Sequence, residues 1–105
     1  MKRLIWLALA ASLVVAFAIA TAAADGDIEK GKAVYEAQKC KMCHFVAGVG
    51  NKKYPLDGVG GKLSADDIKK WIVTPKEMKK ETTMKAYKLS DEDLDNLLAY
   101  MASLK

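Results

Sequence analysis

The chain has 105 residues and a formal charge of +4, and 51% of its residues are hydrophobic. This length allows one small domain, and the high apolar content with few prolines argues against disorder. Two cysteines are too few for a disulfide-rich scaffold. The single arginine lies near the N-terminus and the lysines alternate with acidic residues, so we expect no nucleic-acid-binding face.

Residues 1–24 have the pattern of an export leader. Lys2 and Arg3 precede a long apolar stretch, and the small residues at its end fit signal-peptidase cleavage before Asp25. We expect cleavage of this signal peptide; the alternative is a retained anchor, because the stretch is just long enough to span a bilayer. In either case residues 25–105 are expected to be exported, to the periplasm in the simplest case. A domain this short needs a further stabilising element, such as a cross-link or a bound group, besides its hydrophobic core.

The exported part predicts an all-α fold with three main helices and no strand. Apolar residues at helical spacing predict the first helix over residues 27–38. Ser64 and Ser90, each followed three positions later by an aspartate, predict the starts of the other two helices. The middle helix must end near Thr74, before a proline, whereas the last carries an apolar stripe. Residues 45–62 contain five glycines and one proline and predict an irregular loop.

The stretch Cys40-Lys41-Met42-Cys43-His44 has the C-x-x-C-H pattern of covalent haem attachment. Two thiols three residues apart project from one face of a turn and can add to the vinyl groups of one porphyrin edge. The imidazole that follows can then bind the iron. A redox dithiol does not require the histidine, a structural zinc site needs four ligands, and a disulfide leaves His44 unexplained. The pattern therefore predicts one haem c, held by two thioethers, with His44 as an iron ligand.

The exported part resembles a small monohaem class I cytochrome c over its whole length. Three segments carry the resemblance: the first helix with its Gly31 and Tyr35, the helix end Trp71-Ile72-Val73-Thr74-Pro75, and the ligand segment Met84-Lys85-Ala86-Tyr87. Lys85 departs from this pattern, since the family often has proline there. The resemblance implies helices wrapped round one covalent haem, and a close crossing of the first and last helices that pairs Gly31 and Tyr35 with Leu97 and Tyr100.

The resemblance also implies that a backbone carbonyl accepts a hydrogen bond from the ring N–H of His44. The family pattern P-x-L-x-G would place its proline at position 54, whereas this chain has Tyr54 followed by Pro55. The acceptor is therefore the carbonyl of either Tyr54 or Pro55.

The second axial ligand is expected to be a methionine, because His44 is the only histidine and Met/His ligation raises the reduction potential. The other methionines lie in the leader, in the attachment turn and in the last apolar stripe, apart from Met78 and Met84. Met84 lies in a polar segment without apolar periodicity and matches the ligand segment of the family. We expect Met84; the alternatives are Met78 and an open sixth position.

These features predict an electron carrier and not an enzyme. With His44 and Met84 on the iron, a low-spin haem cycles between ferric and ferrous states while no substrate reaches the metal. The expected partners are redox proteins, and we expect a monomer that contacts a membrane only if the leader is retained. The lysines round the ligand segment either form a solvated loop or steer acidic partners: Lys76, Lys79, Lys80, Lys85 and Lys88.

Two other functions compete with the free carrier. One is a haem-based catalyst or gas sensor with an open sixth position, for which the sequence offers no second histidine as a distal group. The other is the carrier subunit of a larger enzyme.

Overall fold

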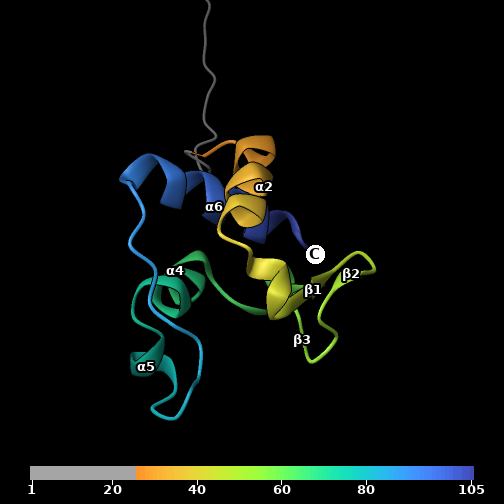
Figure 1. Cartoon of the computed structure of the whole chain (residues 1–105). Coiled ribbons are helices and arrows are strands. Elements are labelled where there is room, and N and C mark those ends of the chain that lie inside the picture. Colours follow the sequence, from red (N-terminus) through yellow and green to blue (C-terminus); the bar gives the residue numbers. More distant parts are fainter. Residues whose placement is uncertain (1–25) are drawn as a thin grey trace, which may run out of the picture.

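The computed structural model describes residues 26–105, so the predicted leader lies outside the described residues. In chain order the elements are α2 (Ile28–Ala37), the 3-10 helix η1 (Cys40–Met42), β1 (His44–Val46), β2 (Val49–Gly50), β3 (Tyr54–Pro55), α3 (Val59–Lys62), α4 (Ala65–Val73), α5 (Pro75–Met78) and α6 (Asp91–Ser103) (Figure 1). Among the helices of this described part, none is both long and apolar enough to cross a membrane.

The described chain has five α-helices and not three; α2, α4 and α6 lie where the sequence predicted helices, and side-chain caps fix where each of these begins. The Asp27 carboxylate accepts a hydrogen bond from a backbone N–H of the first turn of α2. The hydroxyls of Ser64 and Ser90 do the same for α4 and α6, each at 3.1 Å. The first turn of each of these helices carries at least one acidic residue, which interacts favourably with the helix dipole.

The all-α prediction needs correction, because residues 44–55 form a small sheet. Its strand order is β2-β1-β3, with β1 antiparallel to β2 and parallel to β3. The strands have two or three residues each, which is too short to show an alternating pattern in the sequence. Two further helices, α3 and α5, have four residues each, too few for an apolar stripe. The stretch predicted as irregular loop therefore contains most of the sheet and one helix.

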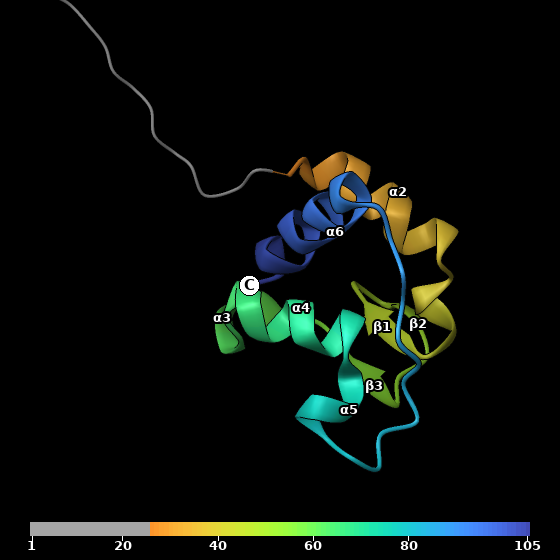
Figure 2. The ribbon, with the colours of Figure 1, turned by 90° about the vertical axis from the view of Figure 1, so that its left-hand side faces the viewer.

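The crossing of α2 and α6 forms the centre of the core, as the family resemblance implied (Figure 2). A side chain at Gly31 would overlap the backbone carbonyl of Asn96, so only glycine allows this approach. The rings of Tyr35 and Tyr100 meet edge to face, with centroids 5.5 Å apart. Buried Asn96, which the sequence analysis did not single out, accepts a hydrogen bond from the Asp27 N–H at 2.8 Å.

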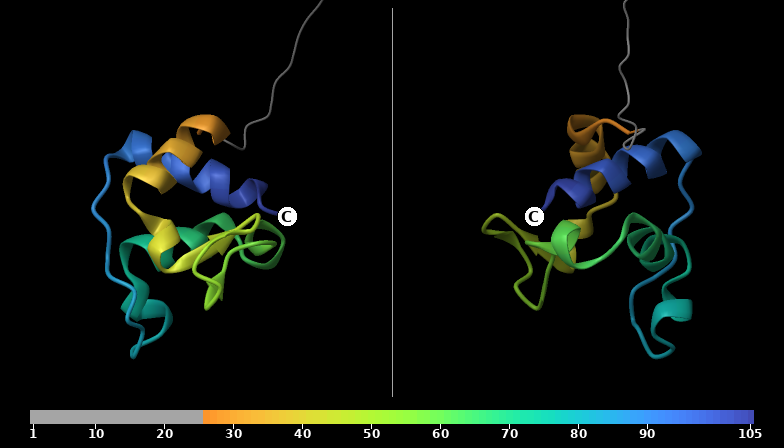
Figure 3. Two further views of the ribbon diagram at one scale, coloured as in Figure 1. Left: turned by 45° about the vertical axis from the view of Figure 1, so that its right-hand side comes forward. Right: turned by 180° about the vertical axis from the view of Figure 1, so that it is seen from behind.

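Below this crossing, α4 packs against α6 through Ile68 and Ile72. Residues 79–90 then run without helix or strand from α5 back to α6, on the side of the molecule opposite the sheet (Figure 3). A hydrogen bond of 2.9 Å from the Tyr87 N–H to the Ile72 carbonyl fastens this segment to α4. The fold thus brings the attachment turn and the predicted ligand segment to the two flanks of one core.

Candidate haem-binding site

The two cysteines lie on one tight turn at the end of α2. Cys40 opens η1, and the Cys43 N–H donates to the Cys40 carbonyl at 3.1 Å. Both thiols are free; Cys40 packs against the core and Cys43 is exposed. Burial raises the pKa of the Cys40 thiol to about 11, and the neighbouring Cys43 adds to the rise while a backbone hydrogen bond opposes it. The turn therefore offers two thiols, one on the core side and one at the surface, for two thioether bonds.

His44 follows directly as the first residue of β1, and its ring is oriented by β3. The parallel register places His44 opposite Tyr54, and Nδ1 of the imidazole lies 2.9 Å from the Tyr54 carbonyl oxygen. A ring nitrogen this close to a carbonyl oxygen is the donor of the bond, and in the neutral imidazole the other nitrogen, Nε2, then has its lone pair available for a metal. Of the two carbonyls that the sequence left open, the acceptor is that of Tyr54 and not that of Pro55.

The predicted ligand segment, residues 84–87, comes close to the attachment turn through its tyrosine. Burial raises the pKa of the Tyr87 hydroxyl, and negative charge on Cys40 and Cys43 adds to the rise. Met84 is half-buried, and its N–H donates to the Thr82 hydroxyl at 3.2 Å. Through Tyr87, the ligand segment therefore packs against the same hydrophobic core as Cys40 of the attachment turn.

The neighbours of Met84 also have defined places. The Nζ of Lys85 lies 5.0 Å from the centre of the Tyr87 ring, within range of a cation–π contact. The alternative ligand Met78 is half-buried at the end of α5.

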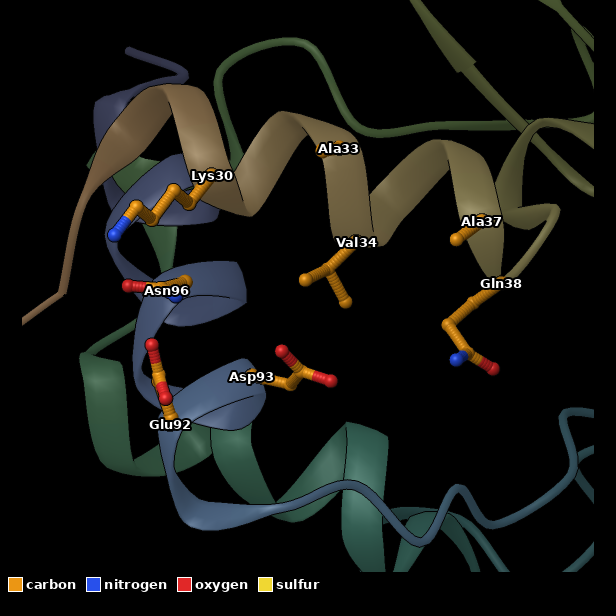
Figure 4. A pocket seen from close by; sticks show the side chains of 8 residues that line it. All are labelled: Lys30, Ala33, Val34, Ala37, Gln38, Glu92, Asp93 and Asn96. Carbon is orange, nitrogen blue, oxygen red and sulfur yellow. The ribbon is translucent and has the colours of Figure 1, made fainter.

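The donor groups of this site fit haem c. Two free thiols on one turn match two thioether bonds, and the imidazole next to them has Nδ1 at a carbonyl, which leaves Nε2 as the nitrogen that can bind the iron. Within residues 26–105, no cluster of three or more His, Cys, Asp or Glu side chains could hold a metal ion without a porphyrin. The hollow between α2 and the start of α6 lies outside this site, since its lining contains none of the predicted haem-binding residues (Figure 4).

The sequence analysis missed one polar residue of the site, Asn51. It follows Gly50 beyond β2, and it makes four hydrogen bonds that connect the attachment turn to the start of β3. The only signal in the sequence was its type and place, because an asparagine after a glycine is typical of a turn.

Comparison with known proteins agrees with this geometry. The family model for cytochrome c matches residues 28–105. Cytochrome c-554(547) of Halothiobacillus neapolitanus is 35% identical over 95 residues, which cover 76% of this chain and 99% of that protein. Cytochrome c oxidase subunit 2 of Alkalihalophilus pseudofirmus is 34% identical over an alignment of 86 residues, which covers 72% of this chain but only 25% of that subunit. The chain therefore belongs to the cytochrome c family of electron-transfer proteins, which carry covalently bound haem c with its iron.

Proposed function

We propose that this chain is an exported single-electron carrier whose haem iron is held between His44 and Met84. The haem, when bound, supplies an iron that takes up and releases one electron. The observation that carries the proposal is the 2.9 Å contact between His44 Nδ1 and the Tyr54 carbonyl. This hydrogen bond fixes the tautomer, makes the imidazole a stronger base and leaves Nε2 as the ligand atom.

The arrangement of the segments supports Met84 as the second ligand. The strand that carries His44 and the segment 79–90 lie on different flanks of the described part of the chain, so a haem bound between them would be approached by His44 from one flank and by Met84 from the other (Figures 1 and 3). Tyr87 anchors the segment to α4 and lies near the attachment turn, three residues beyond Met84. A thioether ligand favours the ferrous iron and raises the reduction potential, which suits a carrier.

Charge on the same flank supports acidic redox partners. The five lysines predicted to surround the ligand segment are all exposed, although Glu77 and Glu81 are exposed among them. Such a surface attracts an acidic partner over a distance of about 10 Å, and salt weakens the attraction. Export to the periplasm with cleavage of residues 1–24 rests on the leader pattern alone.

A second candidate function is delivery of electrons within an oxidase complex. The match to a quarter of cytochrome c oxidase subunit 2 favours it, because a domain of this kind occurs there in a longer chain. The mass of the native protein in solution separates the two: a monomer supports the free carrier, and a stable complex with other chains supports the oxidase.

The ligand proposal is tested by Met84→Ala, with Met78→Ala as the matched control. Met84→Ala should keep the covalent haem, by mass, and the helices, by circular dichroism. The ferrous protein should then bind carbon monoxide stoichiometrically, and the reduction potential should fall because the thioether is gone. Met78→Ala should change neither property.

Each other outcome has a definite meaning. If the ferrous Met78→Ala variant binds carbon monoxide and Met84→Ala does not, Met78 is the ligand and the carrier function stands. If neither variant changes carbon monoxide binding, neither Met78 nor Met84 is the second axial ligand of the iron. Rapid, complete carbon monoxide binding by the unmodified ferrous protein would contradict the carrier and favour a sensor or catalyst.

A further inference from the structure

We infer that Asn51 is a positioning residue for the axial histidine: its side chain holds the start of β3 so that the Tyr54 carbonyl receives the His44 ring proton. The inference rests on the proposed ligation by His44. Its evidence is a set of hydrogen bonds that converge on Asn51 from the attachment turn and from β3.

Asn51 binds the attachment turn through three carbonyl groups. Its backbone N–H lies 2.9 Å from the His44 carbonyl oxygen and 3.2 Å from that of Lys41. Its side-chain Nδ2 donates to the Met42 carbonyl at 3.3 Å. One residue therefore satisfies the carbonyls of Lys41 and Met42, between the two cysteines, and that of His44, after them.

The other end of the Asn51 side chain reaches toward β3. Its Oδ1 accepts a hydrogen bond of 2.9 Å from the Lys53 N–H, directly before Tyr54. The Tyr54 carbonyl in turn faces Nδ1 of His44. The path therefore closes on itself: it leaves the His44 carbonyl, passes through Asn51, Lys53 and Tyr54, and returns to the His44 ring.

Gly50 explains how Asn51 comes so close to the histidine. Gly50 has a φ of 115°, in the region that favours glycine, and a Cβ there would overlap the His44 carbonyl oxygen. The β1–β2 register ends where Phe45 faces Gly50, and Asn51, the next residue, adds one backbone hydrogen bond to the His44 carbonyl before the chain turns toward β3.

The expected consequence is chemical as well as structural. A partner that accepts the Nδ1 proton makes the imidazole more basic, and a more basic ligand stabilises ferric iron relative to ferrous iron. Without the Asn51 side chain the Tyr54 carbonyl should hold the ring proton less well. The potential should then become more positive, and the ring proton should exchange faster with solvent.

The test compares Asn51→Ala with Ser90→Ala in the protein with its haem attached. Both remove a side-chain oxygen that accepts one backbone N–H, and the Ser90 bond caps α6, an element that does not carry His44. In the ferrous protein, nuclear magnetic resonance should show that the His44 Nδ1 proton exchanges about tenfold faster in Asn51→Ala, a factor in keeping with one weakened hydrogen bond. The potential should rise in Asn51→Ala alone.

Two further variants keep the test decisive. Asn51→Asp retains an oxygen that accepts from the Lys53 N–H and loses only the Nδ2 donor to the Met42 carbonyl, which is not part of β3. Exchange of the His44 Nδ1 proton should therefore stay close to that of the unmodified protein. Proton exchange is the measure for this variant, because the added negative charge itself lowers the reduction potential. If Asn51→Ala fails to mature, Asn51→Ser takes its place, since a serine hydroxyl makes the same local bond more weakly, and both shifts must keep their sign.

The inference is overturned if Asn51→Ala, or Asn51→Ser in its place, lowers stability as Ser90→Ala does but leaves exchange and potential unchanged. Asn51→Asp exchanging as fast as Asn51→Ala would also overturn it. Failure of the proposed function looks different: the unmodified ferrous protein would then lack the ring-current-shifted resonances of a haem-bound histidine.

Discussion

Tyr35 is where the crossing of α2 and α6 can be tested most directly. Its side chain is only 5% exposed, and its ring meets that of Tyr100 edge to face at 5.5 Å and 63°. Truncating a buried aromatic side chain costs about 3–5 kcal/mol, of which such a ring pair contributes about 0.5–1.5 kcal/mol. Tyr35→Ala should therefore lower the free energy of unfolding by about 3 kcal/mol while the haem spectrum stays that of six-coordinate iron.

Tyr35→Phe is the matched control, because it keeps the ring and removes only the hydroxyl. That hydroxyl is buried, and no residue of the described chain accepts a hydrogen bond from it. Its removal should change the free energy of unfolding by less than about 1 kcal/mol. Denaturant unfolding of both variants, followed by circular dichroism and by haem absorbance, gives the two values. A loss below about 0.5 kcal/mol in Tyr35→Ala would mean that the crossing does not depend on this ring.

The same residue predicts an alkaline loss of stability. Burial, with smaller contributions from Cys40 and Tyr100, raises the pKa of Tyr35 from 10.0 to about 12 in the folded protein. A phenol whose pKa is higher when folded stabilises the fold fully below pH 10 and loses this effect as the pH rises toward 12. The unmodified protein should therefore lose more stability between pH 10 and 12 than Tyr35→Phe. Equal slopes would contradict this assignment.

Two further predictions concern the crossing and the haem. Gly31→Ala should destabilise the fold by about 1–3 kcal/mol despite the better helix propensity of alanine, because its Cβ would overlap the Asn96 carbonyl. Gly61→Ala is the control, since no atom lies within 4 Å of the added Cβ, and it should leave the stability unchanged. Thermal unfolding of both variants measures the difference. Replacing Cys40 and Cys43 together by alanine should abolish covalent haem by mass, and circular dichroism should show a largely unfolded chain. A cooperatively folded, haem-free double variant would show that the fold does not depend on bound haem for its stability.

The helices could be predicted because their signals are local. Ser64 and Ser90 stand where a hydroxyl accepts from the N–H three residues on, and in the structure both cap a helix. The close crossing at Gly31, which the family resemblance implied, is also present, since a Cβ there would overlap the Asn96 carbonyl.

The sheet and its hydrogen bonds could not be predicted, because they depend on register between short segments. Two-residue strands carry no alternation, so nothing in the sequence distinguishes the Tyr54 carbonyl from that of Pro55. Asn51 and Asn96 likewise act through backbone groups of residues far from them in sequence or round a turn. Residue type marked both as polar, but only the fold supplies their partners.

The two proposed iron ligands differ in how firmly the chain holds them, and this difference sets which should leave first. His44 is part of β1, which is paired on both sides, and its ring and its carbonyl are each hydrogen-bonded. Met84 lies in a segment without helix or strand, where Thr82 and Tyr87 provide the hydrogen bonds on either side of it. Segments with few buried contacts open at lower free energy than paired strands. Heat or mild denaturant should therefore release the methionine while the histidine remains bound and the thioethers keep the haem in place.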